Sequence, residues 1–557
     1  MPSGSELFIS TLRQFGVTHL FTLVGDHLND VLRVADRQGL RLIDVRHESA
    51  AAHMADGWAR LTRQPGVSLV TGGPGHTNSI TGVATAFATG SPMIAISGMR
   101  HSKLGERNAF QELDQISTMR GLTKWAAIPP EPVQLPFYLR RAFTEAINGR
   151  PGPVHLSVPF DFFSAEVPAT APPAAPVSLR PAPDRQDVER LLDLLSRSER
   201  PVVIAGSGVW WSDACSELES FIEKASAPLY TACLGRGAVS DLHPLCFGYG
   251  DPSLNRAAKK AFQDADLFLI LGKRIDYRLG LGGPQVLNPH AQIVQVDIHP
   301  QELGLNRKLE LPICADIKAT LQMASGGLGS LPGTRRQEWL RNLRDGDRKW
   351  RQALCAAADA GTPLHPAAVF QALEPGIPDS ATLCWDGGDF VHWGRCILRA
   401  RRPGHWLRLG PLATLGACLP IGLAAKLARP AQPAVVFAGD GSIGFYMAEF
   451  DTAVRHNLPV VIILGNDGCW GIEKQLQLGD ADARASGGEK TVACGLLRSR
   501  YDLVMKALGG EGEHVERIDQ LRPALDRALA SGRPYCINIE IRSARSPFSE
   551  YQLEMRK

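Results

Sequence analysis

Short apolar runs that end at glycine, proline or aspartate recur along the chain, and stretches with helical spacing separate them. Clear runs lie at residues 19–24, 67–73, 92–97 and 153–159. A run that is apolar throughout is typical of a strand buried on both faces, as in parallel sheets whose crossover helices cover both sides. The pattern therefore predicts an α/β protein built from doubly wound parallel sheets.

Two stretches with the composition of linkers divide the chain. Residues 166–184 are rich in proline and alanine, and residues 325–336 are rich in glycine and serine, which suits extended connections between domains. We therefore expect three doubly wound domains. Their predicted limits are a first domain at 1–165, a linker at 166–184, a central domain at 185–324, a linker and helical connector at 325–357, a third domain at 358–543 and a C-terminal tail at 544–557.

The composition narrows the class of protein. Apolar residues make up 44% of the 557 residues and the formal net charge is +3, which is typical of a globular protein and does not favour a nucleic-acid partner. The eleven cysteines form no CxxC pair, so neither a zinc site nor a disulfide framework is expected. No apolar stretch is long enough to cross a membrane, and the N-terminus lacks a signal-peptide pattern. We expect a cytoplasmic protein that binds neither nucleic acid nor membrane.

The sharpest motif lies at residues 434–471. A strand-like run at 434–438 leads into Gly439-Asp440-Gly441-Ser442, and a second run at 460–464 leads into Gly465-Asn466-Asp467-Gly468. Parallel strands end at the same edge of a sheet, so Asp440 and Asp467 should lie close together. Two carboxylates there suit Mg²⁺, which bridges protein oxygens to phosphates, while a helix that begins after the first turn supplies N–H groups to the anion.

Other interpretations of this motif remain open. Gly439, Gly441 and Gly444 also fit the G-x-G-x-x-G pattern of a dinucleotide-dependent oxidoreductase, but Asp440 would repel a pyrophosphate without a cation, and no hydride-transfer site is evident. The two turns could also be unrelated, or the chain could be a scaffold that has lost catalysis.

The two turns resemble the diphosphate-binding motif of thiamine diphosphate enzymes, in which GDG is followed by Asn-Asn. The resemblance implies thiamine diphosphate held through Mg²⁺. The implied metal ligands are the side chains of Asp440 and Asp467 and the carbonyl oxygen of Cys469, with Gly439, Gly441 and Ser442 beside the diphosphate. This chain has Asn-Asp instead of Asn-Asn, which keeps an oxygen ligand and adds one negative charge.

Motifs in the first 120 residues resemble, in order, the pyrimidine-binding domain of the same superfamily. They are RHE-x-x-A-x-x-M-A-D-G around Glu48, TGGPGHTN at 71–78, and Gln111. The resemblance makes Glu48 the acid that protonates the cofactor's pyrimidine ring, which needs a carboxyl group with a raised pKa, and places Gln111 in the active site.

Three further segments match by resemblance. Leu415, with Ala413, falls where the family supports the bent cofactor, and Asp386, Gly387 and Gly388 match the loop that closes over the diphosphate. In the central domain, residues 206–211, Arg274 and residues 295–300 resemble the domain that holds FAD, ADP or coenzyme A in some relatives and no nucleotide in others.

Within the superfamily, the stretches HLFTLVGDHLNDVL, DGGDFV and GNDGCWG resemble the acetolactate-synthase-like branch, close to 2-hydroxyacyl-CoA lyase and benzaldehyde lyase. The implied activity is cleavage or formation of a carbon–carbon bond in a small 2-hydroxy carbonyl substrate, with an acetolactate-synthase-type decarboxylating carboligase as the alternative. His27 matches a histidine that moves a proton near the reacting carbon, and the role of His76 is left open.

The resemblance also implies an assembly. Glu48 lies in the first domain, whereas Asp440 and Asp467 lie in the third. Relatives complete the site across a subunit interface, so we expect a homodimer as the minimal active unit and a homotetramer built from two such dimers.

Overall fold

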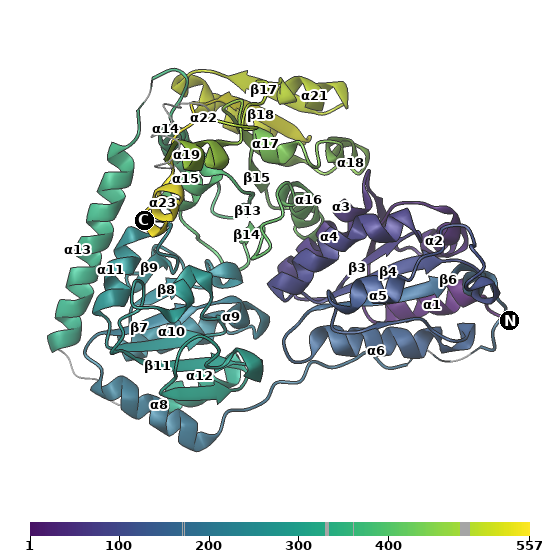
Figure 1. Ribbon diagram of the computed structural model, residues 1–557, viewed down its shortest axis with the longest axis horizontal. Helices are drawn as coiled ribbons and strands as arrows, with labels where there is room; N and C mark the ends of the chain where they lie inside the picture. Colours follow the sequence, from purple (N-terminus) through teal and green to yellow (C-terminus); the bar gives the residue numbers. More distant parts are fainter. Residues whose placement is uncertain (170, 172, 329–333, 360, 480–490, 557) are drawn as a thin grey trace.

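The computed structural model describes residues 1–169, 171, 173–328, 334–359, 361–479 and 491–556. These residues form three six-stranded sheets whose neighbouring strands all run parallel. Helices flank each sheet, and the three units lie around a common centre (Figure 1). The predicted fold class is confirmed.

The first and third sheets share one strand order. It is β2-β1-β3-β4-β6-β5 in the first sheet and β14-β13-β15-β16-β18-β17 in the third. The strands of the first sheet are β1 (His19–Thr22), β2 (Arg41–Asp44), β3 (Gly66–Val70), β4 (Met93–Met99), β5 (Ala126–Ala127) and β6 (Pro153–Pro159). Those of the third are β13 (Thr382–Trp385), β14 (Trp406–Arg408), β15 (Ala434–Gly439), β16 (Val460–Asn466), β17 (Glu511–Val515) and β18 (Tyr535–Glu540). In both sheets the order reverses beside the first strand, where open α/β sheets bind ligands.

The central sheet has a different order, β12-β11-β10-β7-β8-β9. Its strands are β7 (Pro201–Ala205), β8 (Leu229–Thr231), β9 (Cys246–Tyr249), β10 (Leu267–Leu271), β11 (Gln292–Asp297) and β12 (Leu311–Cys314). Counted along the chain this is the order 3-2-1-4-5-6 of dinucleotide-binding domains, with its reversal between β7 and β10.

The helices alternate with these strands. In the first domain they are α1 (Gly4–Gln14), α2 (Asn29–Arg37), α3 (Glu48–Thr62), α4 (Pro74–Thr89), α5 (Gln115–Arg120), α6 (Leu135–Ile147) and α7 (Phe160–Ser164). In the central domain they are α8 (Arg185–Arg197), α9 (Ser207–Trp211), α10 (Cys215–Ala225), α11 (Arg256–Asp264) and α12 (Ile317–Gly327). The remaining helices are α13 (Thr334–Ala356), α14 (Pro366–Leu373), α15 (Asp389–Ile397), α16 (Cys418–Ala428), α17 (Asp440–Ile443), α18 (Glu449–Arg455), α19 (Gly471–Gly479), α21 (Tyr501–Ala507), α22 (Ile518–Ala530) and α23 (Pro547–Met555).

The first and third domains pack through small residues. A Cβ atom added to Gly57 of α3 would lie 3.1 Å from the backbone of Ile421 in α16. Within the first domain, one added to Gly82 of α4 would lie 2.4 Å from Ala52 of α3. These helices therefore approach more closely than larger side chains would allow. One buried apolar cluster runs through the contact from the first domain into the third, which fixes the two domains relative to each other.

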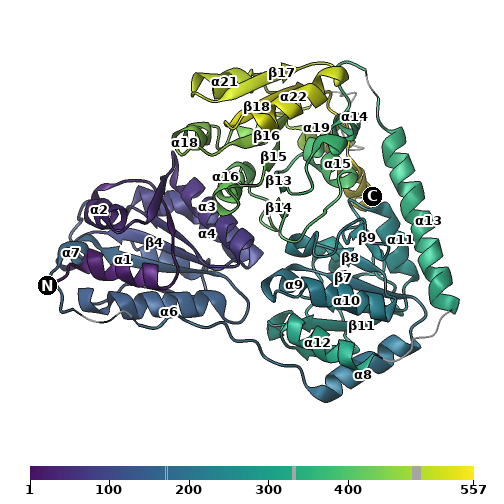
Figure 2. The same cartoon turned by 180° about the vertical axis from the view of Figure 1, so that it is seen from behind.

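The connections differ in character. Residues 165–184 pass from the first domain to α8, with residues 170 and 172 of this predicted linker outside the described part. The second predicted linker is partly helical, since α12 continues to Gly327 and α13 begins at Thr334, with 329–333 outside the described residues. Helix α13 runs along the outside of the central and third domains (Figure 2). No described helix is long and apolar enough to cross a membrane.

One local expectation is wrong. The apolar spacing of Met447, Phe450 and Val454 predicts a helix after Gly439-Asp440-Gly441-Ser442, but α17 ends at Ile443 and α18 begins only at Glu449, so Met447 lies outside both helices. The break places the side chain of Tyr446 against the first domain, where its hydroxyl oxygen lies 2.7 Å from Oγ of Ser49. A tertiary contact has overridden the helical spacing.

Candidate active site

A glycine-rich loop at residues 71–75, which joins β3 to α4, brings together three side chains that the sequence singles out in the first domain. They are His27, Glu48 and Gln111. A Cβ atom added to Gly72, Gly73 or Gly75 would lie within 3.4 Å of one of these side chains, a different one for each glycine. The absence of side chains at these three glycines therefore makes room for the three polar groups.

Glu48 is the first residue of α3 and is only 9% exposed. One of its carboxylate oxygens accepts a hydrogen bond from Nδ2 of Asn78 over 2.9 Å. Asn78 lies in α4, so the two helices that begin at this edge of the sheet hold the carboxylate between them. The sequence motif contains Asn78, but only the structure identifies it as the partner of Glu48.

His27 is buried, and its ring is fixed by the same loop. The backbone N–H of Gly72 donates to Nδ1 of His27 over 3.1 Å, and Oγ1 of Thr71 lies 3.1 Å from the same nitrogen. The ring stacks on Phe160 with a centroid distance of 5.7 Å. Burial lowers the pKa of His27. A backbone N–H only donates, so Nδ1 carries no hydrogen and the neutral ring carries it on Nε2.

Gln111 lies in the long loop between β4 and α5 and has a left-handed backbone, with φ at 57°. Oγ1 of Thr71 lies 3.5 Å from its Oε1. Thr71 thus stands between Gln111 and His27, a position that sequence reasoning did not single out.

His76, in contrast, lies inside the first domain. Its ring nitrogens are 3.0 Å from Oγ of Ser97 and 2.7 Å from Oγ1 of Thr118, and the ring packs edge-on against His155. Burial lowers its pKa to about 4. His76 is therefore a neutral residue of the domain interior.

In the third domain, the turns after β15 and β16 bring Asp440 and Asp467 together. Asp440 is 2% exposed, and within the described part of the chain its Oδ2 has no hydrogen-bond partner. Burial, and next the negative charge of Asp467, raise the pKa of Asp440 to about 7. Two close carboxylates without a cationic partner are unfavourable unless a proton or a cation lies between them. The donor set therefore fits a hard divalent cation.

Backbone hydrogen bonds fix the residues around Asp440 and Asp467. The backbone N–H of Cys469 donates to Oδ1 of Asp467 over 3.3 Å, and the N–H of Gly439 donates to Oγ of Ser442 over 3.1 Å. A Cβ atom at Gly441 would lie 2.7 Å from the ring of Trp470. The predicted diphosphate residues thus form one compact turn against the segment that carries Asp467.

Asp386 holds the turn that carries Leu415. Its buried carboxylate accepts backbone hydrogen bonds from Gly387 and Gly416, both at 2.9 Å, and from Cys418 at 3.2 Å. Burial raises its pKa to about 6. The side chain of Asp386 therefore shapes the neighbouring turn.

The turn around Leu415 packs tightly against the loop that contains Gly387 and Gly388. A Cβ atom at Gly387 would lie 2.5 Å from the side chain of Leu415. Ala413 has a left-handed φ of 56°, and Gly388 has a φ of 109°. Leu415 is half-buried.

The polar contacts described above do not connect Glu48 with the pair Asp440 and Asp467. Within the described residues, no hydrogen bond or ion pair joins Glu48 to Asp440 or Asp467. Glu48 lies in the first domain, and Asp440 and Asp467 lie in the third.

A cavity of about 490 Å³ lies where the three domains meet. It opens at the reversal of the central sheet and is lined by all three segments that the sequence singles out there, through Ser207, Arg274 and Asp297 among others. Its lining includes Arg60, Arg63, Arg150, Arg274, Arg278 and Arg408, together with the acidic residues Asp276, Asp297, Glu302 and Asp316. In the described part of the chain, all of these arginines except Arg408 pair with a carboxylate. Guanidinium groups at a switch point suit a phosphate-bearing ligand.

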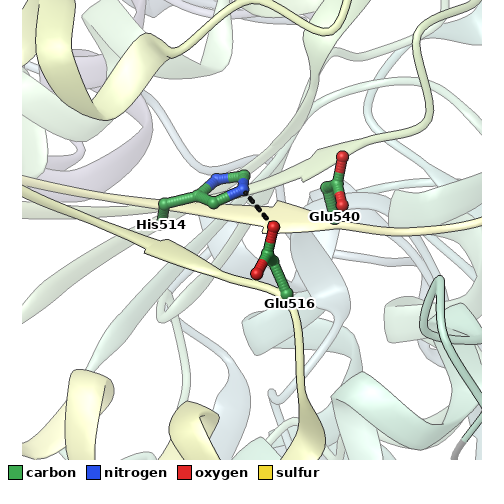
Figure 3. Close-up of side chains that lie close together, drawn as sticks. All are labelled: His514, Glu516 and Glu540. Atoms are coloured by element: carbon green, nitrogen blue, oxygen red, sulfur yellow. Dashed lines mark ion pairs between the residues drawn. The ribbon is translucent and has the colours of Figure 1, made fainter.

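Figure 3 shows another group of metal-ligand type, formed by His514, Glu516 and Glu540. It lies at the ends of β17 and β18. Nε2 of His514 is 3.4 Å from Glu516, and Arg498 is 3.5 Å from Glu540. Because Arg498 already supplies positive charge here, the pair Asp440 and Asp467 is the better match for the cofactor's metal.

Comparison with protein families finds three thiamine pyrophosphate enzyme domains along the chain. Residues 2–118 match the N-terminal TPP binding domain of thiamine pyrophosphate enzymes, residues 188–324 match their central domain, and residues 386–539 match their C-terminal TPP binding domain. Thiamine pyrophosphate is another name for thiamine diphosphate.

Similar proteins span almost the whole chain. An acetolactate synthase large subunit of Mycobacterium tuberculosis is 34% identical over 540 residues, 96% of this chain and 95% of the relative. The 2-hydroxyacyl-CoA lyase 2 of Caenorhabditis elegans is 31% identical over 574 residues, covering 95% and 87%. A sulfoacetaldehyde acetyltransferase of Castellaniella defragrans is 30% identical over 546 residues, covering 94% and 90%. The chain is thus a thiamine diphosphate-dependent enzyme and belongs to the acetolactate-synthase-like branch of the thiamine pyrophosphate enzyme family.

Proposed function

We propose that the protein is a carbon–carbon lyase or carboligase that acts on 2-hydroxy carbonyl compounds, either 2-hydroxyacyl-CoA thioesters or acyloins. The observation that supports this proposal is the fixed ring of His27, which carries its hydrogen on Nε2. A buried N–H donor beside Gln111 suits the hydroxyl or carbonyl oxygen of such a substrate.

Mg²⁺ would be held by Asp440, Asp467 and the carbonyl oxygen of Cys469. The unpartnered Oδ2 of Asp440 and its raised pKa support this assignment, because a cation removes the repulsion between the two carboxylates. Gly439, Gly441 and Ser442 would lie beside the diphosphate.

When bound, the cofactor would supply a nucleophilic carbon and the means to stabilise negative charge on a substrate carbon. Glu48 would give a proton to the pyrimidine ring, with Asn78 holding its carboxylate. Leu415 would support the bent cofactor from below, in the turn fixed by Asp386. Nε2 of His27 and the amide of Gln111 would orient the substrate oxygen.

A complete site would require two chains. Since Glu48 and Asp440 belong to different domains, which relatives bring together across a subunit interface, we propose a homodimer in which each site takes its acid from one subunit and its metal ligands from the other. Pairing of such dimers would give a homotetramer.

The cavity between the domains would hold a nucleotide, and its cationic lining favours one with a diphosphate. FAD, ADP and coenzyme A all fit that description. Mass analysis of the small molecules released by denaturing the purified protein identifies the ligand directly, and a preparation that releases none and binds none on addition would contradict this assignment.

An acetolactate-synthase-type reaction is the second candidate, favoured by the relative of that name at 34% identity. The deciding experiment incubates the enzyme, loaded with thiamine diphosphate and Mg²⁺, with a 2-hydroxyacyl-CoA, a benzoin-type acyloin and pyruvate in parallel. Release of an aldehyde from either of the first two supports our proposal. Turnover of pyruvate alone would support the second candidate.

A further inference from the structure

Glu449, at the start of α18 in the third domain, binds the backbone of the first domain. Its side chain is 1% exposed. Both of its carboxylate oxygens accept hydrogen bonds from the backbone N–H of Arg46, over 3.1 and 3.2 Å, and the hydroxyl of Thr452 donates to it over 2.5 Å. The mechanism proposed above does not use this buried carboxyl group.

Arg46 lies two residues before Glu48, in the loop between β2 and α3. Directly after Glu48, Ser49 contacts the same third-domain segment, because its Oγ lies 2.7 Å from the hydroxyl oxygen of Tyr446. The residues on both sides of Glu48 are therefore held by the segment 446–449. Among the described residues, no other third-domain segment forms a hydrogen bond to a residue within two positions of Glu48.

This contact does not follow from the stability of the fold alone. A carboxyl group at 1% exposure costs free energy that backbone N–H donors offset only in part. An apolar side chain would avoid the cost of burying the carboxyl group, but it would leave the backbone N–H of Arg46 without this acceptor. The carboxylate of Glu449 instead fixes the direction and distance of the backbone N–H of Arg46. Glu48, two residues further on, needs such a fixed position if its placement determines the rate of proton transfer.

The segment is also continuous with the metal site. Asp440 begins α17, and the chain passes from α17 through Tyr446 to Glu449 within ten residues. In the proposed dimer Asp440 of this chain serves the other site, so this short stretch joins the metal ligands of one site to the side chains that hold Glu48 of the second.

We propose that Glu449 and Tyr446 are positioning residues that set the orientation of Glu48 for proton transfer to the cofactor. This inference rests on the role of Glu48 in the proposed function. Glu449 acts through the backbone of Arg46, and Tyr446 acts through the side chain of Ser49.

The test compares Glu449→Gln and Tyr446→Phe with the wild type. Asp451→Asn is the matched control, since Asp451 lies on the same helix but pairs with the side chains of Arg46 and Arg455. Three quantities are measured: amide hydrogen exchange of residues 45–50, the Kd for thiamine diphosphate, and exchange of the reactive-carbon proton of the bound cofactor into D₂O, followed by NMR. The last reports the action of Glu48 without any substrate.

Glu449→Gln keeps one acceptor oxygen and loses the other. We expect faster amide exchange at Arg46, proton exchange of the cofactor slower by about 10-fold or more, and a Kd within about 2-fold of the wild type because no cofactor contact changes. Tyr446→Phe removes only a hydroxyl and should slow the proton exchange by a smaller factor. The control should match the wild type in all three.

Faster amide exchange with unchanged proton exchange would overturn the proposal, since Glu449 would then support the fold alone. If Glu449→Gln does not fold, unchanged proton exchange in Tyr446→Phe has the same meaning. Failure of the proposed function looks different: Glu48→Gln would then exchange the cofactor proton as fast as the wild type does.

Discussion

The backbone N–H of Gly72 donates a hydrogen bond to Nδ1 of His27 over 3.1 Å. This bond determines what the histidine can do. Nδ1 cannot take up a proton without losing the bond to Gly72, and Nε2 already carries a hydrogen. We therefore propose that His27 donates a hydrogen bond to the substrate, instead of moving a proton as the resemblance implies.

Substitution of His27 distinguishes these roles. Glutamine offers an N–H donor near the position of Nε2 but cannot transfer protons at neutral pH. His27→Gln should retain turnover within about 10-fold of the wild type, whereas His27→Phe should lose about 100-fold, as expected for the loss of one donor. Steady-state kinetics on the substrate found by the parallel assay gives both values. Equal losses in the two variants would favour proton transfer by His27.

The metal site makes a prediction about charge. Asp440→Ala should abolish tight binding of thiamine diphosphate, because the diphosphate would lack its cation. Asp467→Asn keeps an oxygen ligand and should bind the cofactor with an affinity within about 10-fold of the wild type, while retaining most turnover. Isothermal titration with Mg²⁺ present measures both variants. Unchanged affinity in Asp440→Ala would refute the assignment.

Binding of the metal should also depend on pH. The pKa of Asp440 is raised to about 7 by burial and by Asp467, so below that pH a proton occupies the position of the cation. The affinity for Mg²⁺ and thiamine diphosphate should therefore fall as the pH is lowered from 8 to 6, with proton release on binding near pH 6. Titrations in two buffers of different ionisation enthalpy measure the released protons. Affinity that is the same at both pH values would contradict a carboxylate pair in this role.

The fold could be predicted further than the site. Runs such as 434–438 and 460–464 are apolar throughout, and this pattern is sufficient to identify buried parallel strands. It carries no information on strand order, so the shared order of the first and third sheets was not foreseen. The same limit applies to side-chain partners. Asn78 could be read in the motif, but its contact with Glu48 depends on the packing of α3 against α4.

Glu449 shows why long-range contacts escape sequence analysis. Glu449 begins α18 after the break at 444–448, and there its carboxylate binds the backbone of Arg46, which lies 403 residues away in sequence. The apolar spacing of Met447, Phe450 and Val454 predicts one helix there, and only the packed domains explain why it is interrupted. The resemblance assigns roles only to residues beside the cofactor or substrate. It therefore does not point to Glu449, whose described hydrogen bonds are all to protein groups.

Stability should respond to acid through His76. Burial lowers its pKa to about 4, whereas in the unfolded chain it titrates near 6.5. Between these values the unfolded state binds more protons, so this group lowers the free energy of unfolding by about 1.4 kcal/mol for each pH unit below 6.5. His76→Gln should therefore lose less thermal stability than the wild type between pH 7 and pH 5. Identical losses in calorimetry would show that His76 does not contribute.

Glu48 should be required for turnover and not for binding. Glu48→Gln keeps the size of the side chain and the contact with Asn78 but cannot deliver a proton. We expect the Kd for thiamine diphosphate to change by less than about 10-fold and turnover to fall by about 100-fold or more. Titration and steady-state rates give the two quantities, and full turnover in this variant would mean that another group supplies the proton.

The dimeric site can be tested by complementation. A chain with Glu48→Gln and a chain with Asp440→Ala should each be nearly inactive alone. If each site takes Glu48 from one subunit and Asp440 from the other, a mixed dimer contains one site with both defects and one intact site. Co-expression with two different affinity tags, followed by purification on both tags in turn, isolates the mixed dimer, which should recover about half the activity of the wild type. A mixed dimer that stays inactive would show that Glu48 and Asp440 of the same chain serve one cofactor, because each site would then carry one defect.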